Sequence, residues 1–130
     1  MKKQNPKNQL SQKSQLKKRG KHLLLDMRFK QKIYSGQVFM FLNRLPDRIA
    51  MRKLSKAIVC NNSNGTVSGY VILYTSHISF HESLNEDNTS NVAIDVYSCK
   101  NFSVIKCLKS IKELLGNYKI IKKQVVRRCS

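Results

Sequence analysis

Strand-like segments dominate the foldable part of this 130-residue sequence and leave room for only two helices. Apolar and β-branched residues recur in short runs between turn-forming residues, whereas helical spacing of apolar residues occurs twice. The predicted strands cover 22–29, 55–60, 67–74, 77–81, 92–99 and 118–126. The predicted helices cover 38–54 and 104–115, the second capped by Ser103, and a polar loop covers 82–91. Pro46 is expected to begin or kink a helical segment, since it has no amide donor. This order predicts an α+β fold, a two-layer α/β sandwich with a mostly antiparallel sheet and both helices on one face.

Basic residues are unevenly distributed along the chain. The sequence has 25 Lys and Arg against 7 Asp and Glu, a formal net charge of +18. Residues 1–19 hold seven of the basic residues and no acidic one, whereas residues 57–99 hold no Lys or Arg. The first segment is polar and without aromatic residues, so we expect a disordered basic tail over 1–19 and one domain over 20–130. Because the tail lacks aromatics to stack on bases, we expect no nucleic-acid partner beyond non-specific contacts of this tail.

Composition also limits the location and the metal chemistry. No apolar run approaches the roughly 18 residues that a membrane span needs, so we expect a soluble, cytoplasmic protein with no membrane partner. The four cysteines, at positions 60, 99, 107 and 129, have no zinc-ligand spacing. We therefore expect free thiols and no metal site.

Reactive side chains concentrate in the centre of the chain. Ser68-Gly69 precedes Ser76-His77, which is followed by His81 and, further on, by Ala93-Ile94-Asp95 and Cys99. These residues and their spacing resemble the prokaryotic S-adenosylmethionine decarboxylases, in which Gly-Val-Ser-Gly precedes a Ser-His-x-x-x-His signature and Ala-Ile-Asp-x-x-x-Cys follows. The segment 20–24 also looks like the opening strand of that family. The resemblance covers about residues 20–128.

The resemblance implies a self-cleaving proenzyme whose cofactor is a covalently bound pyruvoyl group. In this family a serine hydroxyl attacks the preceding carbonyl and elimination then cuts the chain. Carried over, Ser76 is the precursor of the pyruvoyl group, and the cleavage site is Thr75–Ser76. The products are a β chain, 1–75, and an α chain, 76–130. The ketone would form a Schiff base with the substrate amine and take up the electrons that decarboxylation releases.

Three further roles follow from the resemblance. His81 is the expected base of self-cleavage, since a histidine pKa lies near working pH. Ser68 is expected to support processing, and Cys99 to return a proton to the product. Strict alternation along a strand places Ser76 and His81 on opposite faces. We therefore expect an irregular backbone near Thr75–Ser76 that brings the two together.

Departures from the family pattern leave the substrate open. Thr75 replaces a glutamate, and residues 82–85 replace Thr-Trp-Pro-Glu, so Glu82 and Glu86 are the remaining candidates for substrate binding. Residues 61–64 lack the aromatic expected to stack on adenine. S-adenosylmethionine, decarboxylated for spermidine and polyamine synthesis, is the first expected substrate, and ornithine or arginine the alternative.

Two non-catalytic readings also stay open, and one expectation concerns assembly. The chain could be a non-processing family member that acts as a binding or partner subunit. It could also be a binding module whose basic tail contacts nucleic acid or acidic lipid. For the enzymatic reading, the resemblance implies a homodimer of processed αβ protomers with sites near the subunit interface.

Overall fold

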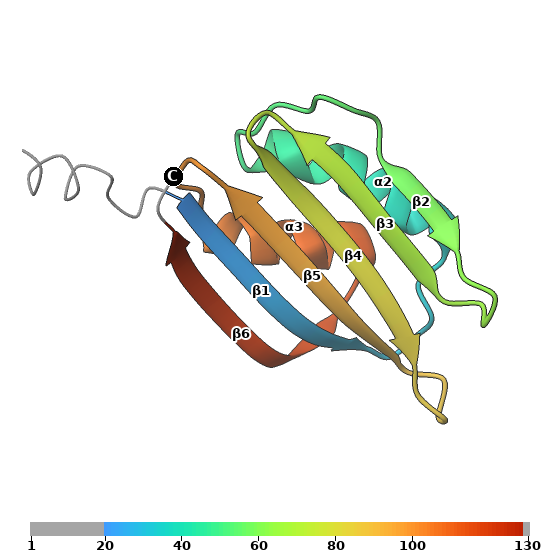
Figure 1. Cartoon of the computed structure of the whole chain (residues 1–130). Helices are drawn as coiled ribbons and strands as arrows, with labels where there is room; N and C mark the ends of the chain where they lie inside the picture. The colour runs from blue at the N-terminus through green and yellow to red at the C-terminus, as the bar shows by residue number, and fades with distance from the viewer. Residues whose placement is uncertain (1–19, 129–130) are drawn as a thin grey trace, which may run out of the picture.

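The computed structural model describes residues 20–128, which form a six-stranded antiparallel sheet with two helices on one face (Figure 1). The predicted two-layer α+β sandwich is therefore confirmed. The predicted disordered tail, 1–19, and Cys129 lie outside the described residues. The elements are β1 (Gly20–Phe29), α2 (Ser35–Arg48), β2 (Ile58–Asn61), β3 (Val67–Leu73), β4 (Ser76–Leu84), β5 (Ser90–Ser98), α3 (Val104–Leu115) and β6 (Tyr118–Arg128).

The strands lie in the order β2-β3-β4-β5-β1-β6. Strands β2 to β5 follow one another as neighbours, whereas β1 is inserted between β5 and β6. Each neighbouring pair is antiparallel, and the β1–β6 register shifts between Asp26 and Met27. The short strand β2 and the long strand β6 are therefore the two edges of the sheet.

Alternation along the strands separates a buried face from an open one. On β1, Leu23, Leu25 and Met27 are at most 1% exposed, and they face the helix layer. The same alternation runs along β5, where every second side chain is buried. Gly69 on β3 lets α2 approach closely, because an added Cβ would lie 2.6 Å from Cδ1 of Leu42. Figure 1 views the open face, opposite the two helices.

The helix α2 and the strand β4 end at other residues than the sequence predicts. The helix stops at Arg48 rather than continuing to 54, soon after Pro46 in its last turn, and Ala50 then takes a left-handed φ of 56°. Strand β4 continues through Leu84, into the segment predicted as a loop. Of the described helices, neither has the length and apolar character needed to cross a membrane.

Candidate functional site

The cleavage site expected from the resemblance lies at a tight hairpin between β3 and β4. Leu73 pairs with Ser76 across a two-residue connection, and Thr75 has a φ of 57°. The left-handed region is unfavourable for a β-branched residue, so the peptide before Ser76 is held in a strained conformation. The expected irregular backbone is thus confirmed at Thr75.

Cys99 lies beside this hairpin. Oγ1 of Thr75 is 2.6 Å from Sγ of Cys99, and Ser76 pairs with Ser98 on the adjacent strand β5. The structure therefore brings together Thr75, Ser76 and Cys99. Next to them is a cavity of about 380 Å³, which Ser76 and Ser98 line together with Tyr74 from the hairpin.

Ser68 and His81 form a second pair on the open face. They stand opposite one another on β3 and β4, and Nδ1 of His81 is 3.2 Å from Oγ of Ser68. The amide of Asn62 donates a further hydrogen bond to the same hydroxyl, at 3.1 Å. The imidazole is exposed, so a group brought against this face can contact it.

Within one chain, the Thr75–Ser76 hairpin does not meet the Ser68–His81 pair. Ser76 and His81 belong to one continuous strand, five positions apart, and their side chains point to opposite faces. Five strand residues span roughly 17 Å. The irregularity at Thr75 precedes the strand and leaves this separation unchanged. The expectation that it joins Ser76 to His81 in one chain is wrong.

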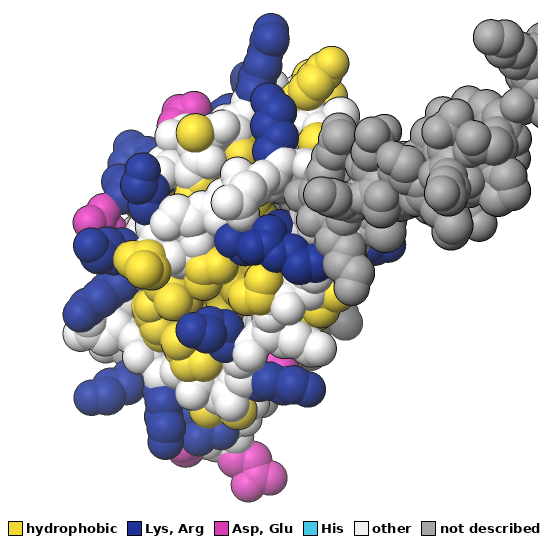
Figure 2. All heavy atoms as spheres, turned by 90° about the vertical axis from the view of Figure 1, so that its left-hand side faces the viewer, with side chains coloured by type: hydrophobic (Ala, Val, Ile, Leu, Met, Phe, Trp, Pro, Cys, Tyr) yellow, Lys and Arg dark blue, Asp and Glu magenta, His cyan; other side chains and the backbone are white. Residues whose placement is uncertain are grey.

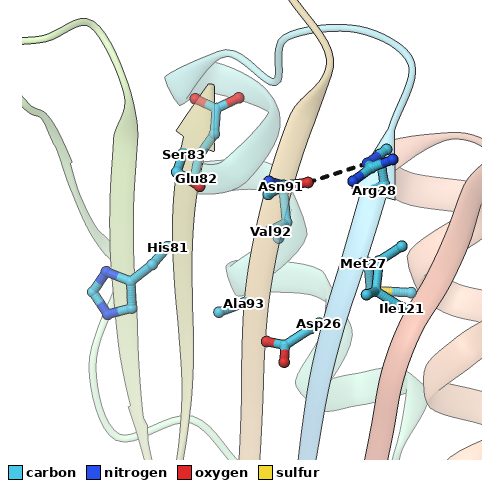
Figure 3. Close-up of a pocket in the computed structure, with 10 residues that line it drawn as sticks. All are labelled: Asp26, Met27, Arg28, His81, Glu82, Ser83, Asn91, Val92, Ala93 and Ile121. Carbon is cyan, nitrogen blue, oxygen red and sulfur yellow. Dashed lines mark hydrogen bonds between the residues drawn. The ribbon is translucent and has the colours of Figure 1, made fainter. Parts of the chain in front are cut away.

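A shallow groove lies beside His81 on the open face (Figure 3). Its volume is about 350 Å³, and its lining includes Asp26, Arg28 and Asn91. Nε of Arg28 donates to Oδ1 of Asn91 at 3.3 Å. In Figure 3 Asp26 and Arg28 lie on β1, whereas His81 lies two strands away on β4 and points toward Ser68 on β3.

The two candidate substrate-binding glutamates lie in very different places. Glu82 is on the helix-facing side of β4, opposite in direction to His81, and its side chain is 0% exposed. Its carboxylate accepts hydrogen bonds from Ser90 Oγ, the backbone N–H groups of Ile33 and Val67, and Lys32 Nζ. Burial alone would raise the pKa of Glu82, but the bonds from Ser90, Ile33 and Lys32 outweigh burial and lower it. Glu86 is exposed in the turn between β4 and β5.

Four rings to which the resemblance gave no role form a row across β3, β4, β5 and β1 on the open face. His77 stacks between Tyr70 and Tyr97, with both centroid distances at 5.5 Å, and His22 meets Tyr97 edge-on at 5.9 Å. Nε2 of His22 lies 3.9 Å from Oδ2 of Asp95. Alternation in the sequence could have identified this row, because these side chains all fall on open-face positions of neighbouring strands.

Burial lowers the pKa of His77, and nearby His22 lowers it further. The lowered pKa favours the neutral form of His77 at neutral pH. The described residues include no group of three or more side chains that could hold a metal ion.

Comparison with known families agrees with this arrangement. The sequence model described as S-adenosylmethionine decarboxylase matches residues 22–128, which covers all six strands and both helices except the first two residues of β1. No curated protein matches the chain at a significant level. The family match includes both the Thr75–Ser76 hairpin with Cys99 and the Ser68–His81 pair. This chain belongs to the S-adenosylmethionine decarboxylase family.

Proposed function

We propose that this chain is a self-processing, pyruvoyl-dependent decarboxylase that acts on S-adenosylmethionine and supplies the aminopropyl donor for spermidine and polyamine synthesis. The observation that carries the proposal is the left-handed Thr75 directly before Ser76, with Cys99 in contact with Thr75. A strained peptide is higher in energy than an ordinary one, so its conversion to an ester is less unfavourable. A serine next to that peptide is the group that makes the conversion possible.

Self-cleavage can be written with these residues. Oγ of Ser76 adds to the carbonyl carbon of Thr75, the C–N bond breaks, and the nitrogen of Ser76 is released as an amine. A base then removes the α-proton of Ser76, and the Thr75 carboxylate leaves from the β-carbon. The remaining enamine takes up water and loses ammonia, which leaves the keto group at the start of residues 76–130. No oxidant or metal is consumed.

The residues around Ser76 fit such a group. A pyruvoyl group at Ser76 would supply a ketone for the substrate amine and a sink for the electrons that decarboxylation releases. The contact of Cys99 with the neighbouring Thr75 supports the proposed role of Cys99, which is to return a proton to the product.

The base for processing comes, in this proposal, from a second copy of the chain. His81 cannot serve its own Ser76, since the strand between them is continuous. The open face exposes apolar and aromatic side chains, including Tyr70 at 39% and Ile72 at 44%. Two copies that pair these faces with their strands antiparallel would bury that surface. Such a dimer would set the Ser68–His81 pair of each copy against the Thr75–Ser76 hairpin of the other.

The open face also suits a cationic substrate. S-adenosylmethionine carries a sulfonium, which aromatic faces attract by roughly 1–2 kcal/mol where water is excluded. Tyr70 presents such a face, and the neutral His77 stacked against it adds no repulsion, whereas the guanidinium of Arg128 already lies over the ring of Tyr97, 5.3 Å from its centroid. Asp26 and Asp95 are the carboxylates of this face.

Mass spectrometry of the denatured protein tests self-cleavage directly. We expect two fragments, residues 1–75 and 76–130, and the second should be lighter by one ammonia than a fragment that begins with serine. Ser76→Ala should stay intact, whereas the control Ser79→Ala, three positions along the same strand, should be cleaved. An intact wild-type chain that no carbonyl reagent labels would refute the proposal.

Coexpression of two inactive variants tests the shared site. Ser76→Ala lacks the nucleophile and His81→Ala lacks the base, so each alone should remain uncleaved. In a mixed dimer, the intact His81 of the first should act on the intact Ser76 of the second. Cleavage of the His81→Ala chain only, read from two different tags, is expected. If neither chain is cleaved in dimers shown to be mixed, the base does not come from the second copy.

Release of carbon dioxide from labelled substrates tests the substrate assignment. We expect turnover of S-adenosylmethionine and none of ornithine or arginine. Turnover of either amino acid in place of S-adenosylmethionine would leave self-cleavage intact and overturn the substrate assignment.

A further inference from the structure

A surface at the β6 edge of the sheet lies apart from both groups of the proposed active site. It is formed by the outer flank of α3 and the helix-facing side of β6. Six of its residues define what we call the α3–β6 patch: Ile105, Leu108 and Lys112 from α3, and Ile120, Lys123 and Val125 from β6. Strands β5 and β1 separate this patch from β4, which carries Ser76 and His81.

The backbone places these side chains on one surface. Positions 105, 108 and 112 follow helical spacing along one flank of α3. The hydroxyl of Tyr118, at the start of β6, donates to the carbonyl of Leu108 at 3.1 Å, which sets this flank beside β6. On β6, the patch residues stand opposite core residues of β1, whose side chains face the helix layer: Ile120 opposite Met27, Lys123 opposite Leu25, and Val125 opposite Leu23.

The patch is both apolar and exposed. Ile105 is 67% exposed, Val125 42% and Ile120 37%, although all three are aliphatic. Figure 2 looks onto this side of the molecule and shows apolar side chains gathered together with Lys and Arg among and around them. A long edge strand with exposed aliphatic residues invites contact with another surface.

Charge limits what that surface can be. Residues 100–128 contain nine Lys and Arg and a single acidic residue, Glu113. Gly20 pairs with Arg128, so the basic sequence 1–19 joins the described chain at the same edge. Such a surface repels the cationic substrate, and two copies joined through it would set like charges together. Its occupant must be anionic and must also accept aliphatic side chains.

We propose that the α3–β6 patch docks the protein on the surface of an anionic phospholipid bilayer. Lysines bind the headgroups, and the aliphatic side chains enter the boundary between headgroups and acyl chains. A nucleic acid would meet the charge but offers no place for the isoleucines, and the patch has no aromatic side chain to stack on bases. Docking at a surface requires no membrane-spanning helix. This proposal replaces the expectation of no membrane partner, which was based on the absence of a span, and it does not depend on self-processing.

Cosedimentation of the full chain with vesicles tests the proposal. We expect binding to phosphatidylcholine vesicles that contain phosphatidylglycerol, weakening with salt, and none to phosphatidylcholine alone. Each basic residue near such a surface contributes about five-fold in affinity, so Lys112→Glu with Lys123→Glu should weaken binding more than about 20-fold. The matched control, Arg44→Glu with Lys56→Glu, makes the same charge change at exposed positions on α2 and before β2 and should weaken it less.

A variant that keeps the charge separates docking from general attraction. Ile105→Gln, at an exposed helix position, should reduce vesicle binding several-fold, with circular dichroism confirming the fold. Binding by residues 1–19 alone would leave Ile105→Gln equal to wild type and the two double variants equal to each other, and would overturn the proposal. So would the absence of binding to anionic vesicles, or tighter binding of an RNA oligomer with the same ranking of variants. Cleavage at Ser76, followed in the same samples, should not change with any of these variants.

Discussion

Replacement of the buried Glu82 by glutamine tests whether this carboxylate stabilises the fold or binds the substrate. Each oxygen accepts two hydrogen bonds: one from Lys32 Nζ at 3.0 Å and Val67 N at 3.2 Å, the other from Ile33 N at 2.9 Å and Ser90 Oγ at 2.7 Å. These bonds join β4 to β3, to β5 and to the segment between β1 and α2. Four donors on one buried group indicate a structural role.

The cost of Glu82→Gln follows from what the amide can still accept. Its oxygen keeps one pair of donors, but its NH₂ group faces the N–H of Ile33, and Lys32 loses its countercharge. Removing one partner of a buried ion pair costs about 3–5 kcal/mol. Because Lys32 is partly exposed and the Ser90 hydroxyl can turn to donate elsewhere, we expect about 2–4 kcal/mol. For a domain of this size that lowers Tm by roughly 8–25 °C.

Urea denaturation followed by circular dichroism measures this change. Glu86→Gln, at an exposed turn position of the same hairpin, is the matched control and should change stability by less than about 0.5 kcal/mol. The folded pKa of Glu82 is lowered, so its contribution is complete above the unfolded pKa and is lost as pH falls through the folded pKa. The difference between wild type and Glu82→Gln should therefore shrink below about pH 4. If Glu82→Gln is as stable as Glu86→Gln at pH 7, the structural role is refuted.

Three further changes have defined outcomes. Gly69→Ala should lower the free energy of unfolding by about 1–3 kcal/mol, since its Cβ would lie 2.6 Å from Leu42 Cδ1, and an unchanged urea midpoint would contradict this. Iodoacetamide should label exposed Cys60 in the native protein but Cys107 only after unfolding, because burial raises the pKa of Cys107 to about 12. Wild type should lose stability as pH falls below about 6.5, because the lowered pKa of His77 makes protonation favour the unfolded chain. In His77→Phe this decrease in stability should be smaller. Equal pH slopes of Tm in His77→Phe and wild type would contradict the last prediction.

The order of strands and helices could be predicted because most segments follow a single period. Along β5, buried and half-buried side chains alternate without exception. The pattern failed where a polar residue faces the core: Glu82 looks like the start of a loop, yet its four hydrogen bonds let β4 continue through Leu84. It also failed after α2, where Leu54 continues the apolar spacing but is 60% exposed. Neither the hydrogen bonds of Glu82 nor the exposure of Leu54 can be predicted from local sequence.

The sequence proposed a set of site residues but not their arrangement. The spacing of Ser68, Ser76, His81 and Cys99 agrees with the family, and alternation correctly placed Ser76 and His81 on opposite faces. What spacing could not give was the second copy that we propose to join them, because one sequence contains no sign of what lies against its open face. Glu82 shows the converse: in sequence it stands next to His81, but in space it belongs to the core.

The order of the strands decides what a cut at Thr75 can do to the molecule. The first fragment would contain β1, β2 and β3, and the second would contain β4, β5 and β6. Backbone hydrogen bonds therefore join the two fragments along three strand pairs, β1–β5, β1–β6 and β3–β4. The two fragments are thus interleaved and cannot part without unfolding. Genes split at this codon should yield a folded protein only when both halves are made together, and that protein should lack decarboxylase activity because the Thr75–Ser76 peptide that forms the pyruvoyl group is absent.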